Sequence, residues 1–344
     1  MKYKKRIVGI DLIKVMACFG VIMLHVSMPF FYSDEIFKTG DTILLSKIIY
    51  YLGTCAVPLF FMANGFFLIN RAKMSLNYIL KKIGLIMIPV LGWNLVIFIL
   101  KMILKKNESG YIVSTVESLI QKGFFFQFWF LGALIIMLML VPILNSVMKK
   151  SIKVFVIILV IFLLISWGID FYNHISGNVP LQKNVIQTFR IWTWLSYYMT
   201  GGLIGNIIKK INFGSLKKTL KYATIATTIL MIIYSIFNIK WISNPYAEYN
   251  YDNILIFVWI VVIFLTCVNI EQFSEYKTKV IESISKYSFG IYIVHVIVLK
   301  IFEKIFTFDG ILTNLVAVMG VFLVSWLITF VIAKIPYVNK LVVF

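Results

Sequence analysis

The side chains of this sequence that are suited to chemistry concentrate in its first long apolar stretch, residues 7–30. Five positions there are spaced 3, 4, 3 and 4 residues apart: Asp11, Lys14, Cys18, Val21 and His25. In an α-helix this spacing places all five side chains on one face. Asp11 and His25 then lie about 21 Å apart along the helix axis, because each residue adds about 1.5 Å. The pattern predicts a helix face with an ion-pair candidate at one end and an imidazole at the other.

Two interpretations of this helix face stay open on the residues alone. Asp11 and Lys14 can form an interfacial ion pair while His25 hydrogen-bonds a neighbouring helix. Alternatively, the face carries function, because ionisable groups in hydrocarbon are costly and histidine is the side chain best suited to proton transfer near neutral pH. The shared face favours function, with His25 as a general base.

Further polar candidates lie in other apolar stretches. His295 stands three residues after Tyr292. A structural role, in which it packs and makes one hydrogen bond, and a functional role both stay open for this histidine. Asn64 precedes Gly65, which indicates either a close helix contact or a polar lining. Trp129 is typical of an anchor at the membrane interface more than of a catalytic group.

A basic segment separates the second apolar stretch from the third and contains Arg71, Lys73, Lys81 and Lys82. Two explanations of this segment stay open. Cytoplasmic loops of membrane proteins are generally rich in Lys and Arg, and a cluster of basic side chains can also bind the phosphates of a nucleotide cofactor. The sequence contains no phosphate-binding P-loop, no Rossmann glycine pattern, no metal-ligand motif and no Gly-x-Ser-x-Gly elbow. Any chemistry must therefore use groups inside the membrane.

The amino-acid composition indicates the class of protein to which these residues belong. Apolar residues make up 61% of the 344 positions, against about 45–50% in an ordinary globular chain, and charged residues only 14%. The three cysteines, Cys18, Cys55 and Cys267, all lie in apolar runs, so no disulfide framework is indicated. Soluble, disordered and collagenous classes are excluded. The sequence predicts an all-α integral membrane protein in contact with the lipid bilayer.

About ten stretches are long and apolar enough to cross a bilayer, which takes about 20 residues as a helix. They are residues 7–30, 48–69, 83–104, 124–147, 152–169, 188–208, 219–239, 251–271, 285–307 and 311–335. With the N-terminus inside, 21 Lys and Arg residues fall in inside segments and seven in outside segments. This bias predicts that both termini are cytoplasmic. It also explains the net charge of +19 without a nucleic-acid partner.

Six motifs in order resemble the membrane acyltransferase 3 family. The opening signature of that family has an Asp, a basic residue three positions later and a His eleven after that, as Asp11, Lys14 and His25 do. Further matches are Phe61–Leu68, Lys81-Lys82 ahead of Pro89, Trp129–Leu131 with Val141–Leu144, Tyr198–Gly202 and Ser288–His295. Lys14 replaces the commoner Arg, which keeps the charge but loses bidentate recognition. Leu85 stands where the family has the second residue of its basic pair.

This resemblance implies an integral membrane O-acyltransferase of the type that acetylates envelope glycans, with many spans in the bacterial cytoplasmic membrane. It implies one membrane-embedded domain over residues 1–344, without an appended extracytoplasmic domain. The acyl donor substrate would be cytoplasmic acetyl-CoA, the acceptor a hydroxyl of an envelope or lipid-linked glycan, and no metal would take part. The implied site residues are His25 and Asp11 for catalysis, Lys14, Lys82 and Arg71 for the donor, and His295, Tyr292, Asn64 and Trp129 in support.

Other functions stay open from the sequence. A proton-coupled transporter or flippase of a glycan or acyl species would use His25 and His295 as proton-coupling groups. A regulatory or sensory membrane domain without turnover is a third hypothesis. The cationic groups near the cytoplasmic side and the order of the motifs favour the enzyme. The acceptor, which can be a capsule, peptidoglycan, teichoic acid, exopolysaccharide or small molecule, and homo-oligomer formation are left open.

Overall fold

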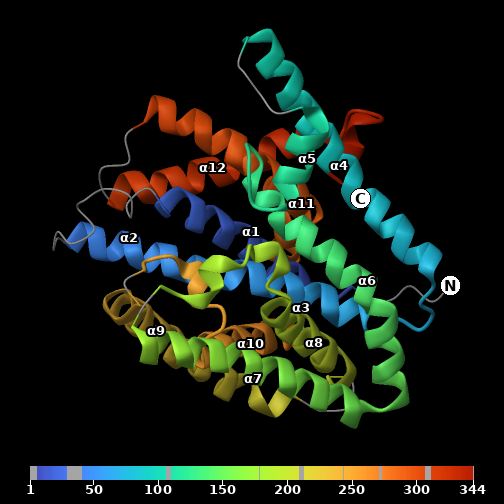
Figure 1. Ribbon diagram of the computed structural model, residues 1–344, viewed down its shortest axis with the longest axis vertical. Coiled ribbons are helices and arrows are strands. Elements are labelled where there is room, and N and C mark those ends of the chain that lie inside the picture. The colour runs from blue at the N-terminus through green and yellow to red at the C-terminus, as the bar shows by residue number, and fades with distance from the viewer. Residues whose placement is uncertain are drawn as a thin grey trace.

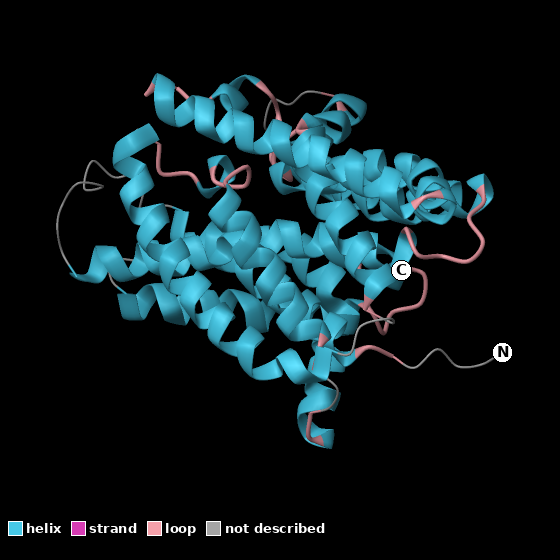
Figure 2. Ribbon diagram, turned by 90° about the horizontal axis from the view of Figure 1, so that it is seen from below, coloured by secondary structure: helices cyan, strands magenta, loops and turns pink. Residues whose placement is uncertain are grey.

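The computed structural model describes residues 6–28, 41–105, 110–177, 179–208, 213–242, 244–270, 273–306 and 311–343. Within these ranges all regular structure is helical, as Figure 2 shows, so the predicted all-α class is confirmed. The helices are α1 (Val8–Ser27), α2 (Asp41–Leu52), α3 (Ala56–Leu68), α4 (Leu76–Ile103), α5 (Tyr111–Leu119), α6 (Trp129–Lys150), α7 (Ile152–Ser176), α8 (Ile191–Ile207), α9 (Lys217–Ile242), α10 (Ile254–Val268), α11 (Glu275–Ile305) and α12 (Ile311–Ile332).

Nine of the ten apolar stretches each overlap one of these helices, the stretch 48–69 covers the end of α2 and all of α3, and several boundaries differ. Among the described residues, seven helical segments have the length and apolar composition to cross a membrane: Val8–Ser27, Leu44–Leu68, Leu76–Ile103, Phe126–Lys150, Ile152–Ser176, Lys217–Ile242 and Leu312–Ile332. Helices α8 and α10 are shorter, with 17 and 15 residues, and α11 has charged residues in its first turns. The protein therefore has several membrane-crossing helices, and the number ten stays a prediction.

Helices α1 and α3 run through the middle of the molecule (Figure 1). Helix α1 packs against both α3 and α11, and α3 also packs against α8. Figure 1 shows α11 and α12 on one side of this central pair and α7, α8, α9 and α10 on the other. Helix α4 lies at the edge, where most of its side chains stay exposed on an apolar surface suited to lipid. Residues of α1 and α3 can thus reach both sides of the core.

The contact between α3 and α8 depends on glycines. A methyl group built on Gly65 of α3 would lie 1.9 Å from the backbone oxygen of Tyr198. One on Gly201 of α8 would lie 2.0 Å from the backbone oxygen of Met62. Small residues allow such close backbone approach between helices in a membrane. Gly65, for which the sequence indicated a close helix contact as one of two possibilities, therefore has this role.

Replacing Gly201 with alanine should destabilise the protein, because backbone atoms of α3 cannot move aside as a flexible side chain could. Overpacking of this kind typically costs about 1–3 kcal/mol. Thermal unfolding of the detergent-solubilised protein measures the effect. The matched control is Gly84→Ala in α4, where the added methyl group would meet nothing within 4 Å. Equal unfolding temperatures for Gly201→Ala and Gly84→Ala would contradict the packing described.

Candidate active site

A first cavity, of about 590 Å³, lies between α1, α3, α4, α6 and α11. Its polar lining residues are Arg6, Asp11, Lys14, Asn64, Tyr78, Lys82, Ser285, Lys286 and Ser288. Four of these are basic and one is acidic, so the cavity suits an anionic ligand. Val343 lines it as well. Arg6 and Val343, the first and the last described residues, therefore both line this cavity.

Asp11 is held by partners that differ from the expected one. Its Oδ2 accepts a hydrogen bond of 2.6 Å from Nε of Arg6, and its Oδ1 accepts one of 2.6 Å from Oγ of Ser285. The ion pair between Asp11 and Lys14 that the sequence offered as one interpretation is wrong for the described residues, because Arg6, which precedes the helix, pairs with the carboxylate instead. The hydrogen bond to Asp11 raises the pKa of Arg6, so the guanidinium stays charged. Asp11 therefore joins the segment before α1 to α11.

Lys14 consequently forms no ion pair with a carboxylate in the part of the chain that the structure describes. It lines the first cavity from α1, and Lys82 lines the same cavity from α4. Two residues that sequence reasoning assigned to the donor are thus brought together, from helices that are far apart in sequence. Lys286 adds a third ammonium group from α11.

Two other expected residues take different positions around this cavity. Asn64 lines it, and its Nδ2 donates a hydrogen bond of 2.9 Å to the backbone oxygen of Phe60. Arg71 is not a lining residue: its guanidinium lies over the ring of Tyr78, 3.8 Å from the ring centroid. Because Tyr78 itself lines the cavity, Arg71 is separated from it by one aromatic ring.

A second cavity, of about 510 Å³, contains His25. Its other polar and aromatic lining residues are Tyr50, Gln121, Phe126, Gln127, Trp129, Phe130, Gln187, Tyr246, Glu248, Tyr249, Tyr251 and Tyr292. No lysine or arginine is among the described residues that line it. Burial raises the pKa of Tyr249 to about 12, so its phenol is a neutral hydrogen-bonding group. The second cavity thus differs in charge from the first.

The His25 ring is half-buried and has two aromatic neighbours. Its centroid lies 5.3 Å from that of Phe126 and 5.2 Å from that of His295. His295 is fully buried, and its Nδ1 lies 2.6 Å from the backbone oxygen of Tyr292. Its Nε2 has no hydrogen-bond partner among the described residues. The structure therefore places the histidines of α1 and α11 side by side.

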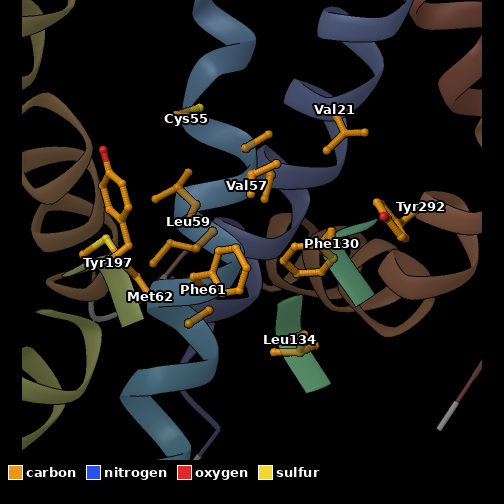
Figure 3. Packing of buried hydrophobic residues seen from close by; sticks show 14 of the residues in the cluster. Val21, Cys55, Val57, Leu59, Phe61, Met62, Phe130, Leu134, Tyr197 and Tyr292 are labelled. Atoms are coloured by element: carbon orange, nitrogen blue, oxygen red, sulfur yellow. The ribbon is translucent and has the colours of Figure 1, made fainter. Parts of the chain in front are cut away.

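Phe130 and Tyr292 line both cavities and form the wall between them. Their ring centroids lie 5.6 Å apart, and Phe130 also packs against Phe61 at 5.0 Å. Figure 3 shows Phe130 of α6 with Phe61 on one side and Tyr292 on the other. The hydroxyl of Tyr292 donates to the backbone oxygen of Gln127, which fixes its ring.

The predicted face of α1 connects the two cavities. Asp11 and Lys14 line the first cavity, while Val21 and His25 line the second. Between them, Sγ of Cys18 donates a hydrogen bond of 3.0 Å to the backbone oxygen of Ser288 in α11. One face of one helix therefore positions both the basic group and the imidazole, as the spacing of these residues predicts.

Trp129 is part of the interior and not an anchor at the membrane interface. Its side chain is 7% exposed and lines the second cavity. Its ring centroid lies 5.2 Å from that of Trp194, which is fully buried. Hydropathy cannot distinguish these positions, because an interfacial and a buried tryptophan both stand at the end of an apolar stretch.

Sequence reasoning missed the polar wall of the second cavity. Gln127 precedes α6, Gln187 precedes α8, and Glu248 lies in the short segment before α10. Nε2 of Gln187 donates to Oε2 of Glu248, and Nε2 of Gln121 lies 3.3 Å from the same oxygen. The one signal in the sequence is the density of tyrosines around Glu248, since these loops otherwise resemble ordinary connections.

Comparison with known proteins identifies a family and one relative. A family model described as an acyltransferase domain matches residues 7–333. An amino-acid racemase of Enterococcus faecalis is 26% identical over 331 residues, which cover 90% of this chain and 43% of that protein. The chain thus spans less than half the length of this curated relative, whose name describes the longer protein. No solved structure matches the chain.

Proposed function

The chain belongs to the acyltransferase 3 family, and on that premise we propose that it is an O-acyltransferase of the cell membrane. It moves an acetyl group from cytoplasmic acetyl-CoA to a hydroxyl of an envelope glycan or related acceptor. One observation carries the proposal: two cavities of unlike charge lie at opposite ends of one face of α1 and share an aromatic wall. A reaction between a polyanionic donor and a hydroxyl acceptor needs two such sites.

The first cavity supports the donor part of the proposal. Coenzyme A carries several phosphate charges, and ammonium groups bind phosphate as point charges. Lys14, Lys82 and Lys286 supply such groups from three helices. Arg6 is engaged by Asp11 and orders this end of the cavity. The apolar wall of the cavity, with Phe60 and Leu134 among its members, suits the uncharged arm that carries the thioester.

The second cavity supports the acceptor part. A hydroxyl placed beside His25 loses its proton to the imidazole while its oxygen attacks the thioester carbonyl. The new carbon–oxygen bond replaces the carbon–sulfur bond, and coenzyme A leaves as a thiolate that takes up a proton. His25 then returns its proton to solvent. The wall of Phe130 and Tyr292 is where acetyl passes from one cavity to the other.

His295 supports His25 as a positioning residue. When Nδ1 of His295 donates to the backbone oxygen of Tyr292, its Nε2 is left as an acceptor. The His25 ring lies beside that nitrogen without a hydrogen bond to it in the structure; once the ring turns to donate to it, the second nitrogen of His25 is unprotonated and available as a base. The buried hydrogen bond of His295 would thus set the tautomer of the catalytic ring.

The proposal is tested with purified protein in liposomes, with isotopically labelled acetyl-CoA on one side and an extract of envelope glycans on the other. We expect labelled acetyl esters on the glycan and an equal amount of free coenzyme A thiol, both by mass spectrometry. Consumption of the donor without acetylated glycan would contradict the acceptor assignment. Movement of unmodified glycan across the membrane, with no use of the donor, would favour the transporter instead.

A further inference from the structure

The second cavity has polar groups in its wall that acetyl transfer by itself does not require. Gln127 is 1% exposed and Gln187 is 6% exposed, and both line the cavity. Both amide atoms of Gln127 and the amide oxygen of Gln187 are buried without a hydrogen-bond partner among the described residues. An unpaired buried polar atom costs about 1–3 kcal/mol, and folded proteins keep few of them. These three atoms mark a place where a ligand supplies both donors and acceptors.

Hydroxyl groups are the ligand groups that fit this set. The amide nitrogen of Gln127 needs an acceptor, and the two amide oxygens need donors. A single hydroxyl can do either, whereas an ammonium group only donates and a carboxylate only accepts. A ligand with several neighbouring hydroxyls can therefore pair with all three atoms.

The remaining wall is rich in aromatic rings. The rings that line the cavity belong to Tyr50, Phe126, Trp129, Phe130, Tyr246, Tyr249, Tyr251 and Tyr292. Aromatic faces pack well against the C–H faces of sugar rings, and phenol hydroxyls add hydrogen bonds at the edges. Apolar rings with a few fixed polar groups are the usual composition of a small-molecule site.

The charges around this cavity disfavour an anionic ligand. The one carboxylate in its described lining, that of Glu248, lies 3.7 Å from Nη2 of Arg190. Arg190 is buried and donates to three backbone oxygens, those of Gln182, Val185 and Glu248. The positive charge of Arg190 balances the carboxylate of Glu248, and its hydrogen bonds go to backbone oxygens and not to a ligand. An anion bound here would lose its water without gaining a free cation, which is unfavourable.

We infer that the second cavity binds an uncharged sugar, whose hydroxyls pair with Gln127 and Gln187 and whose ring packs against the surrounding tyrosines. The inference rests on the proposed function in one respect, namely that the bound sugar is the acceptor of the acetyl group. It narrows the acceptor to glycans whose accepting residue carries neither phosphate nor carboxylate. Teichoic acids and polymers of uronic acids are thereby excluded.

Gln127→Leu in the full-length protein in detergent tests this inference. Its amide makes no hydrogen bond within the described chain, so leucine removes no hydrogen bond to the protein and the variant should fold normally. Ser166→Ala in α7 is the matched control, because its hydroxyl is also buried and unpaired but does not line the cavity. Binding is measured by calorimetry without acetyl-CoA. The probes are neutral tetrasaccharides of glucose, galactose and N-acetylglucosamine, and the anionic tetragalacturonate.

We expect the best neutral tetrasaccharide to bind wild type at least about tenfold more tightly than tetragalacturonate, and Gln127→Leu to weaken it about tenfold. Ser166→Ala should bind as wild type does. Equal affinity for tetragalacturonate, no binding of any neutral probe, or unchanged affinity in Gln127→Leu would each overturn the inference. The comparison of probes on wild type does not depend on the variant.

The two proposals fail in distinguishable ways. A neutral sugar that binds as described but never receives acetyl would remove the proposed function and leave the sugar site. Efficient acetylation of tetragalacturonate would do the reverse, because transfer would be established and the preference for an uncharged acceptor would be wrong.

Discussion

Replacing His25 with alanine should lower acetyl transfer about 10²–10⁴-fold, the usual contribution of a general base, while the protein still folds and inserts. The side chain is half-buried at the edge of a cavity and makes no hydrogen bond within the described chain. Its loss should therefore cost little stability. The measurement is the rate of labelled ester formation by purified protein in liposomes, compared with thermal unfolding of the same sample.

A second readout separates catalysis from binding. Because His25 lines the cavity away from Lys14 and Lys82, the affinity for coenzyme A should be unchanged in His25→Ala. His295→Phe keeps the His25 imidazole and removes its buried neighbour, so it should slow transfer less than His25→Ala does and leave coenzyme A affinity unchanged. Near-normal turnover by His25→Ala would remove it as the base, and unchanged turnover by His295→Phe would remove the positioning role.

Replacing Lys14 with alanine should weaken coenzyme A binding about tenfold at low salt, which corresponds to about 1.4 kcal/mol. The ammonium group faces the first cavity, and Asp11 is engaged by Arg6 and Ser285, so the lysine charge is available to a phosphate. Salt screens charges over about 10 Å at 0.1 M, and the difference between wild type and variant should shrink as salt is added. Titration of coenzyme A by calorimetry at several salt concentrations measures both effects.

Two variants bracket this result. Lys14→Arg keeps the charge and should bind nearly as wild type does. Lys73→Ala removes a cation from the basic segment that also contains Lys82, but Lys73 does not line the cavity, so coenzyme A affinity should change little. If Lys14→Ala and Lys82→Ala both bound coenzyme A as tightly as wild type, the donor would have to be held elsewhere.

The helical architecture could be predicted because hydropathy reports directly on which segments leave water. Every one of the ten apolar stretches overlaps at least one helix, and the spacing of polar residues in the first of them placed Lys14 and His25 on one face. Helix ends were harder to predict. Helix α7 continues to Ser176 because its terminus is set by Gly177 in a left-handed conformation, φ 59°, and not by a change in hydropathy.

The polar contacts of the site could not be predicted, because they join segments that only the tertiary fold brings together. Asp11 accepts hydrogen bonds from Arg6 and from Ser285. Ser285 is on α11, 274 positions away in the sequence. Gln127 and Glu248 stand in connections with no periodic pattern, so nothing in the local sequence marks them as members of one cavity. Their assignment required the packing of α6 and α8 around α3.

The wall of Phe130 and Tyr292 bears on how much charge the proposed reaction moves across the membrane. Moving one elementary charge through a membrane potential takes about 2.3 kcal/mol per 100 mV. In the proposed reaction the phosphates of the donor stay with the lysines of the first cavity, and the group that passes the wall is an uncharged acetyl. The protons do not cancel in the same way, because one is released beside His25 in the second cavity and another is taken up by the thiolate in the first. Each turnover of the proposed reaction would therefore move one elementary charge across the wall, and its rate should depend on the membrane voltage.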